Sequence, residues 1–242
     1  MILAAGLGTR LGPMTSERPK ALVEVGGRTL LEINLARLRT FGIREVIINA
    51  HHFADMLADY LLAHQNFGMN IEVSYEEVLL DTGGGIKRAA HFFRDPDEPF
   101  LVHNVDVLST IDFDRMLQFH IEKKALATLA VQERATSRYL LFDEKDQLCG
   151  RRAGLDSPPE LVYPVANPRA LAFSGLHILS PRIFSLLDEE GTFSVIPEYL
   201  RLAAQREPVF AFRAEQYYWR DLGRPENVYQ AAREIAEGLY KD

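Results

Sequence analysis

Glycine, arginine and lysine gather in one short stretch directly behind the first apolar residues of the chain. The segment at 3–22 has the sequence LAAGLGTRLGPMTSERPKAL. Glycines that follow a strand let backbone N–H groups approach an anion closely, and Gly6 and Gly8 are placed to do so. Arg10 and Lys20 add positive charge that suits a triphosphate better than a bridging diphosphate. The stretch therefore predicts a phosphate-binding loop, in preference to an ordinary surface turn.

Two aspartates that are far apart in the sequence are candidate ligands for a metal ion. Asp106 follows the strand-like PFLVHNV, and Asp221 follows the strand-like YYW. Ligand sites of open α/β sheets gather at such strand ends. Mg²⁺ prefers carboxylate oxygens and takes its remaining ligands from phosphates and water. Their occurrence together with the glycine loop predicts a Mg²⁺ site, with Mn²⁺ as the alternative cation, although either aspartate alone indicates only a strand-end turn.

Other chemistries have weaker support. Leu11 stands where a dinucleotide-binding loop needs its third glycine, and no G-K-[ST] follows as in a Walker A loop. His51 and His52 lack a third metal ligand at suitable spacing, so solvation at a strand end explains them better. Cys149 has no neighbouring His or second Cys and is expected to be a small buried residue.

Composition narrows the class of protein further. The 242 residues carry a net charge of -7, which argues against a partner such as nucleic acid or an anionic membrane. A single cysteine excludes an internal disulfide and fits a reducing compartment, so we expect a cytoplasmic protein. No apolar run approaches the roughly 20 residues that span a bilayer. We expect no targeting segment, and the short first strand leaves open whether residues precede Met1.

The elements that must position these residues alternate through the first half of the chain. Apolar strand-like runs are followed by segments with helical periodicity, which predicts an α/β fold with a Rossmann-like, doubly wound, mostly parallel sheet. We expect strands at 2–5, 45–50, 70–76 and 99–105, and helices at about 29–41, at about 53–64 and from Gly85.

The pattern changes after about residue 124. ALATLAVQE, RYLLFDEKDQLCG and ALAFSGLHIL indicate strands joined by turns, followed by helices and the pair PVFAFR and YYWRDLG. This predicts a small antiparallel extension that makes the sheet mixed. The loop at 156–168 carries four prolines and is expected to be a flexible lid. The last helix is expected to open at Pro225 and run to the end, and we expect one domain over 1–242.

The opening stretch resembles the signature loop of the sugar-1-phosphate nucleotidyltransferase family, L-A-[AG]-G-x-G-T-R-L-x-P-x-T-x-x-x-P-K, at every defined position from Leu3 to Lys20. DTGGGI most resembles the branch of the N-acetylmuramate-1-phosphate uridylyltransferases, with the heptose- and mannose-1-phosphate guanylyltransferases close behind. The other landmarks occur in the family's order: LDTGGGI at 80–86, HNVDV at 103–107, FSGLHIL at 173–179 and WRDLG at 219–223.

The resemblance implies the nucleotide-diphospho-sugar transferase fold and a reaction in which an NTP and a sugar 1-phosphate give an NDP-sugar and pyrophosphate. UTP or GTP is the expected nucleotide, in the formation of cell-envelope precursors or in salvage. The attacking phosphate is already an anion at pH 7, so no general base is needed. Positioning, N–H donors, cationic side chains and Mg²⁺ are expected to provide the rate enhancement. The oligomeric state stays open.

Roles are carried over from the family residue by residue. The resemblance implies that Arg10 braces the β- and γ-phosphates, that Lys20 neutralises charge near the α-phosphate, and that Asp106 and Asp221 hold the metal. It places the nucleotide against Ala4, Ala5, Gly6, Gly8, Thr9, Glu76, Thr82, Gly83 and Gly84, and the sugar against Ser174 and Gly175.

The sequence departs from the family at two places, and two other functions stay open. Val105 replaces a common glycine, and a mid-chain Lys that holds the sugar phosphate has no clear counterpart, because Lys145, Arg151 and Arg152 are equally consistent with solvated charges. One alternative is a catalytically silent regulatory module that binds nucleotide or sugar. The other is a cytidylyltransferase acting on a phosphorylated alcohol such as phosphocholine. Four retained charged residues disfavour the first, and FSGLH modestly disfavours the second.

Overall fold

The computed structural model describes residues 1–240, which group into two compact units. Unit 1 consists of Met1–Asp81, His103–Ile111 and the C-terminal segment from Tyr217. Unit 2 consists of Thr82–Val102 and Asp112–Gln216. Each unit is therefore assembled from segments that are distant in the sequence. The single domain expected from the sequence stays a prediction.

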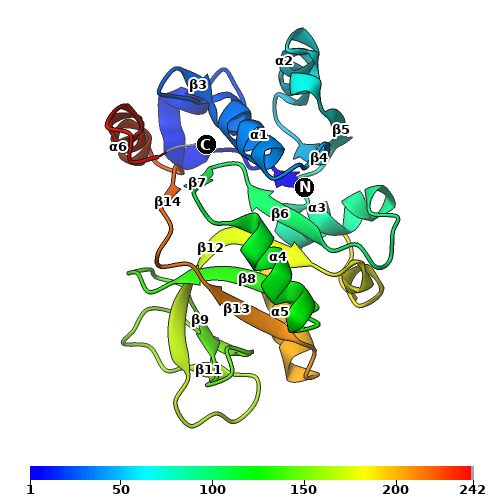
Figure 1. Ribbon diagram of the computed structural model, residues 1–242, viewed down its shortest axis with the longest axis vertical. Coiled ribbons are helices and arrows are strands. Elements are labelled where there is room, and N and C mark those ends of the chain that lie inside the picture. Colours follow the sequence, from blue (N-terminus) through cyan, green and yellow to red (C-terminus); the bar gives the residue numbers. More distant parts are fainter. Residues whose placement is uncertain (241–242) are drawn as a thin grey trace. The chain divides into compact units, whose positions relative to one another are not determined.

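Unit 1 is built on a parallel sheet (Figure 1). Its shortest strand, β1 (Ile2–Leu3), pairs with β4 (Glu45–Ala50) on one side and with the end of β6 (Phe100–Asn104) on the other. Beyond β4 lies β5 (Asn70–Tyr75). All three pairings are parallel, as the alternating pattern predicts.

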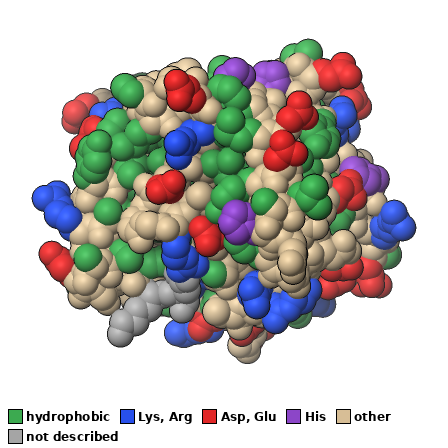
Figure 2. Space-filling model, turned by 90° about the horizontal axis from the view of Figure 1, so that it is seen from above, with side chains coloured by type: hydrophobic (Ala, Val, Ile, Leu, Met, Phe, Trp, Pro, Cys, Tyr) green, Lys and Arg blue, Asp and Glu red, His purple; other side chains and the backbone are tan. Residues whose placement is uncertain are grey.

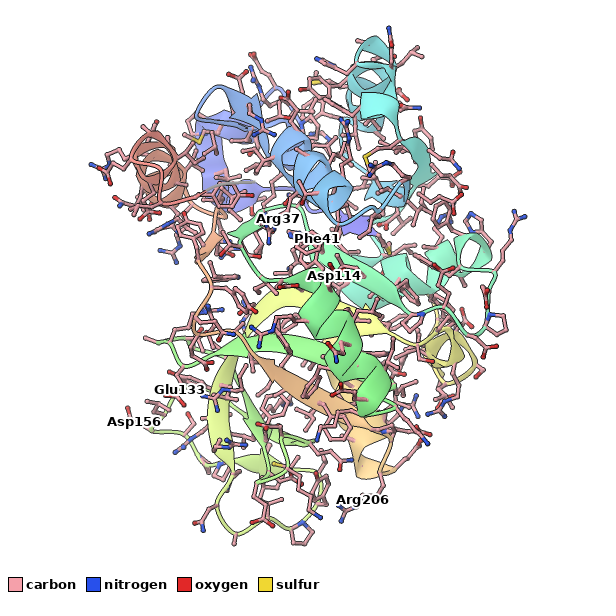
Figure 3. The ribbon with its side chains drawn as sticks, viewed as in Figure 1. Arg37, Phe41, Asp114, Glu133, Asp156 and Arg206 are labelled. Carbon is pink, nitrogen blue, oxygen red and sulfur yellow. The ribbon has the colours of Figure 1, made fainter. Side chains whose placement is uncertain are left out.

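Two helices of unit 1 agree with the sequence pattern, α1 (Leu30–Thr40) and α2 (Ala54–Ala63). Thr29 caps α1 through a reciprocal pair of hydrogen bonds with Glu32, the arrangement known as a capping box. Arg37 of α1 lies over the ring of Phe41, 5.2 Å from guanidinium carbon to ring centroid (Figure 3). Its Nη2 donates to the carbonyl of Ile111 at 2.7 Å, so α1 is tied to the segment that carries Asp106.

The helix expected from Gly85 begins earlier, so that prediction was wrong. The helix α3 spans Asp81–Arg88 and continues as a 3₁₀ turn over Ala89–Phe92. Glycine is unfavourable in helix interiors, which is why the sequence pattern places the start after the glycines. Tertiary contacts override that preference, because the N–H groups of Gly83 and Gly84 both donate to the carbonyl of Phe193.

Unit 2 contains the antiparallel strands expected after residue 124. They are β8 (Ala127–Gln132), β9 (Tyr139–Phe142), β10 (Leu148–Arg152), β11 (Glu160–Leu161) and β12 (Arg169–Leu179), paired in the order β11-β10-β9-β12-β8. The helix α4 (Phe113–Glu122) contacts β8 and β12, and α5 (Val195–Ala204) contacts β10 and β13 (Val209–Arg213). The strand β11 lies within the proline-rich loop at 156–168, and the lid expected there stays a prediction.

The last two strands do not form the pair that the sequence suggests. PVFAFR contains β13 (Val209–Arg213), which lies parallel to β8 in unit 2. YYWRDLG contains β14 (Trp219–Asp221), which pairs antiparallel with β7 (Val107–Ser109) in unit 1. The final helix, α6 (Pro225–Ala236), begins at the expected proline but ends before Gly238, whose φ is +74°.

The remaining elements are short. Those of unit 1 are β2 (Glu24–Val25), β3 (Arg28–Thr29) and the 3₁₀ turns Thr9–Thr15, Lys20–Leu22 and Gln65–Gly68. Unit 2 has a 3₁₀ turn at Pro181–Ser185.

Burial and surface charge agree with the composition. Cys149 is fully buried against Leu141 and Tyr163, as predicted, and burial raises the pKa of its thiol to about 12. On the face shown in Figure 2, Lys and Arg side chains are interspersed with Asp and Glu. Among residues 1–240, every helix is too short or too polar to cross a lipid bilayer.

Candidate functional site

The loop after β1 is folded back on itself and leaves its ligand-binding candidates at the surface. Gly8 has a φ of +66°, and the Thr15 hydroxyl donates to its carbonyl at 3.0 Å. A Cβ at Gly8 would lie 2.9 Å from the Thr15 methyl group, so this position requires glycine. Gly6, Thr9 and Arg10 are exposed. The loop therefore presents backbone and one guanidinium to solvent, as a phosphate site needs.

The residues just before this loop are engaged within the protein. The N–H of Ala4 donates to Asn49 Oδ1 at 2.7 Å, and the N–H of Ala5 does so at 3.4 Å. Asn49 Nδ2 donates in turn to Glu76 Oε1 at 2.7 Å, and Glu76 Oε2 accepts from the N–H of Leu80 at 2.9 Å. The sequence analysis missed Asn49, whose only signal is a polar residue near the end of a buried strand.

Lys20 and Asp106 meet as an ion pair, with about one tenth of each side chain exposed. Lys20 begins a 3₁₀ turn, and Asp106 lies between β6 and β7. The backbone beside Asp106 is fixed, because Asn34 Nδ2 donates to the carbonyl of Val105 at 2.8 Å and the N–H of Val105 donates to the carbonyl of Leu3 at 3.0 Å. Valine in place of the family's glycine is thus accommodated with its side chain buried.

Asp221 is brought to the same region by the β7–β14 pairing. Asp221 is in register with Val107, and the N–H of Leu222 donates to the carbonyl of Asp106 at 2.7 Å. Asp221 Oδ1 accepts from the N–H of Gly223 at 2.9 Å. A Cβ on Gly223 would lie 2.8 Å from Arg10 Nη2 and 2.9 Å from Asp221 Oδ1, so the guanidinium lies beside this carboxylate.

The helix α6 anchors the strand that carries Asp221. Arg220 forms two hydrogen bonds to the Glu234 carboxylate, which also accepts from the Tyr218 hydroxyl at 2.7 Å and from Gln230 Nε2 at 2.9 Å. Burial by itself raises the pKa of Glu234. The hydrogen bonds from Tyr218, Gln230 and Arg220 outweigh that effect, and the pKa lies below its ordinary value. The sequence analysis missed this ion pair, because its partners lie on different elements.

The donor set fits a hard divalent cation. Asp106 and Asp221 supply carboxylate oxygens, with Lys20 and Arg10 beside them for phosphate charge. Within the described part of the chain, no three His, Cys, Asp or Glu side chains form a cluster that would hold a metal unaided. Two protein carboxylates, completed by phosphate and water, are what Mg²⁺ commonly uses. The nitrogen Nδ1 of His51 is 2.7 Å from the Glu76 carbonyl oxygen.

In unit 2, the expected base-binding segment is held by Phe193 and its neighbours. Thr82 Oγ1 accepts from the N–H of Val195 at 3.0 Å. A Cβ on Gly83 would lie 2.3 Å from the Phe193 ring, so this glycine allows the ring to pack against the helix. The backbone N–H groups of Gly83 and Gly84 both donate to the carbonyl of Phe193. Contact of these three residues with a base stays a prediction.

The expected sugar-binding residues lie at an irregularity in β12. The register of β12 against β8 shifts between Phe173 and His177, and Gly175 has a φ of +76°. Ser174 is fully buried. Their contact with a sugar stays a prediction.

The mid-chain basic residues have local partners. Lys145 lies in the β9–β10 turn, Arg151 pairs with Glu160 at 2.6 Å, and Arg152 Nε donates to the carbonyl of Ser157 at 2.7 Å. These contacts favour the interpretation as ordinary turn and surface residues. We assign none of them to the sugar phosphate.

Comparison with known proteins finds relatives that align with most of this chain. The N-acetylmuramate alpha-1-phosphate uridylyltransferase of Caulobacter vibrioides is 33% identical, over 98% of this chain and 96% of the relative. The mannose-1-phosphate guanyltransferase of Yarrowia lipolytica is 30% identical, over 94% of this chain. The chain spans 61% of the length of that guanyltransferase.

The fold has close counterparts among solved structures. HddC from Yersinia pseudotuberculosis, in a complex with GMP-PN, superposes with a TM-score of 0.76 at 22% identity over 97% of each chain. This likeness supports the α/β fold with its mixed, mostly parallel sheet. A family model described as nucleotidyl transferase matches residues 1–238. With that match and the signature loop intact from Leu3 to Lys20, the chain belongs to the nucleotidyl transferase family.

Proposed function

We propose that this protein transfers a nucleotidyl group from an NTP to a sugar 1-phosphate and releases pyrophosphate. An oxygen of the sugar phosphate bonds to the α-phosphorus of the NTP. The bond from that phosphorus to the oxygen bridging to the β-phosphate breaks, and pyrophosphate leaves with the electron pair. No proton must be removed from the attacking group at pH 7. The main barrier is therefore repulsion between two polyanions.

The observation that carries the proposal is the gathering of two cations and two carboxylates beside an exposed glycine loop in unit 1. Lys20 lies against Asp106, and Arg10 lies beside Asp221. A module that only binds sugar or nucleotide has no need of all four charges. This juxtaposition favours catalysis over the silent regulatory module.

Each residue then has a role that its position supports. Arg10, exposed on the loop, braces the β- and γ-phosphates and stabilises the charge that builds on the leaving pyrophosphate. Lys20, mostly buried, neutralises charge near the α-phosphate. Gly6, Gly8 and Thr9 offer backbone contacts to the nucleotide. Mg²⁺ bound by Asp106 and Asp221 would polarise the phosphoryl oxygens and offset their charge.

UTP and GTP are the favoured nucleotides. The Caulobacter uridylyltransferase corresponds to this chain over nearly the full length of both, whereas the fungal guanyltransferases match over part of their length. UTP is therefore the first nucleotide to test. The sequence has a single cysteine, Cys149, which fits a reducing compartment, and we propose a cytoplasmic location.

The test is pyrophosphate release by the purified protein with Mg²⁺. UTP, GTP, CTP, ATP and dTTP are each paired with a panel of sugar 1-phosphates and with phosphocholine. Release that needs one NTP and one sugar 1-phosphate is the expected result. Release with CTP and phosphocholine would instead identify the cytidylyltransferase alternative. Binding of a nucleotide without turnover on any acceptor would contradict the proposal and favour the regulatory module.

A further inference from the structure

A buried pair of polar side chains connects the loop after β1 to the segment that leads into α3. Asn49 is 3% exposed and Glu76 is 4% exposed. Asn49 lies on β4, and Glu76 directly follows β5, the neighbouring parallel strand. Burying a carboxylate is unfavourable unless its oxygens are hydrogen-bonded. Both oxygens of Glu76 are satisfied within the protein, one by Asn49 and one by the N–H of Leu80.

The direction of every hydrogen bond in this pair is fixed by chemistry. Backbone N–H groups can only donate, so the atom of Asn49 that faces Ala4 and Ala5 must be its oxygen. The amide nitrogen of Asn49 must then face Glu76. It donates to Glu76 Oε1 at 2.7 Å, while Oε2 accepts from Leu80. Every donor in this series of hydrogen bonds, from the loop to Leu80, therefore faces an acceptor.

One end of the pair lies at Ala4 and Ala5, which the sequence assigns to the nucleotide, and the other end lies at Leu80. Ala4 and Ala5 lead directly into Gly6 and Gly8, and Leu80 immediately precedes the DTGGG segment. The backbone of Glu76 is itself fixed, because its N–H donates to the carbonyl of Ala50 at 2.8 Å. Loss of either side chain would therefore remove hydrogen bonds that fix the backbone at Ala4 or at Leu80.

We propose that Asn49 and Glu76 are positioning residues that set nucleotide affinity by fixing the backbone of Ala4 and Ala5, which leads into the glycine loop, and the backbone of Leu80. This inference rests on the proposed nucleotidyl transfer and changes one detail of it. Glu76, which the family resemblance places against the nucleotide, acts through Asn49 and Leu80, each of which donates a hydrogen bond to one of its carboxylate oxygens. Binding of the sugar phosphate does not depend on the pair.

Reversing the polarity of the pair provides the test. In Asn49→Asp, two carboxylates face each other where an amide now donates at 2.7 Å. In Glu76→Gln, the new amide nitrogen meets a second donor at either Asn49 or Leu80. In the double variant, the carboxylate introduced at position 49 is not opposed by charge: its oxygens accept from Ala4 and from the new glutamine, whose own oxygen accepts from Leu80. The double variant keeps the formal charge of the wild type.

The measurements are KM for the NTP, KM for the sugar 1-phosphate, and NTP binding by calorimetry without the sugar phosphate. Each single variant is expected to raise the KM and the Kd for the NTP about tenfold or more, because mismatched buried polar groups are costly. The double variant is expected to return to within roughly threefold of the wild type. KM for the sugar 1-phosphate stays unchanged throughout. Ser74→Ala, a small buried change on β5, is the matched control and is expected to alter neither constant.

Several outcomes would overturn the proposal. One is NTP affinity within twofold of the wild type in both single variants. Another is a double variant that binds NTP no better than the weaker single variant. If a single variant does not fold, the double variant tests the proposal instead: its melting temperature shows whether it folds, and its NTP affinity is then compared with that of the wild type. A wild-type protein that binds no NTP would overturn the proposed function together with this inference, whereas normal NTP binding in all variants would overturn only the inference.

Discussion

Gly223→Ala tests whether Arg10 and Asp221 act at one site. A methyl group there would lie 2.8 Å from Arg10 Nη2 and 2.9 Å from Asp221 Oδ1, where ordinary contact begins at 3.4 Å. The two groups must therefore retreat by about 0.6 and 0.5 Å, the differences between 3.4 Å and these distances. The atoms nearest to the added methyl group all belong to the ends of these two side chains, so the substitution perturbs the site directly.

The effects on stability and on activity are expected to separate. Gly223 does not have a positive φ, so alanine is compatible with its backbone. Replacing glycine by alanine at such a position typically raises the free energy of unfolding by about 0.4–1 kcal/mol, because the unfolded chain loses conformational entropy. Arg10 is exposed and can move at little cost. Displacing a phosphate-positioning group by 1 Å costs about 100-fold in rate, so a shift near 0.6 Å is expected to lower kcat/KM by roughly 10- to 100-fold, or about 1.4–2.7 kcal/mol.

The assay compares kcat/KM for pyrophosphate release with the thermal unfolding midpoint. Gly6→Ala is the matched control, because a Cβ there meets no protein atom within 4 Å. Its methyl group points into open space, so it is expected to leave both the unfolding midpoint and kcat nearly unchanged. Wild-type kcat/KM in Gly223→Ala would refute the inference that Arg10 and Asp221 cooperate. A large fall in the unfolding midpoint would refute the inference that the displacement is local.

Three further predictions concern other parts of the molecule. Asp106→Asn is expected to lower turnover by roughly 100-fold or more, because a metal ligand contributes several kcal/mol to the transition state; turnover above a tenth of the wild-type value, with the fold intact by circular dichroism, would contradict the metal role. Gly83→Ala brings a methyl group to 2.3 Å from the Phe193 ring and is expected to destabilise the fold by about 1–3 kcal/mol in chemical denaturation, whereas a wild-type midpoint would show that the ring yields freely. Burial lowers the pKa of both His103 and His120 to about 4, so the folded protein keeps them neutral while the unfolded chain takes up protons near pH 6.5. The free energy of unfolding is therefore expected to fall as the pH drops from about 6.5 towards 4. If the His120→Gln variant shows the same slope of unfolding free energy against pH, His120 makes no contribution.

Local pattern was enough to predict most elements of unit 1. The capping residue Thr29 and the positive φ of Gly42 mark the ends of α1, and both signals depend on neighbouring residues alone. The strand EVIINA agrees with β4 residue for residue. The start of α3 was mispredicted, because its glycines are unfavourable in a helix and only the distant Phe193 makes them suitable.

The sequence by itself determined which chemistry we propose for this protein. Glycines, two cations and two aspartates at family spacing predict a nucleotide-phosphate site, because those residue types are what phosphates and Mg²⁺ require. Only the tertiary structure decided which groups meet: that Asp106 pairs with Lys20, that Arg10 lies beside Asp221, and that Asn49 joins Ala4 to Glu76. The reason is physical. Residue type and local periodicity are encoded along the chain, whereas a contact between residues tens of positions apart depends on how the strands pair and on which partner each buried polar atom finds.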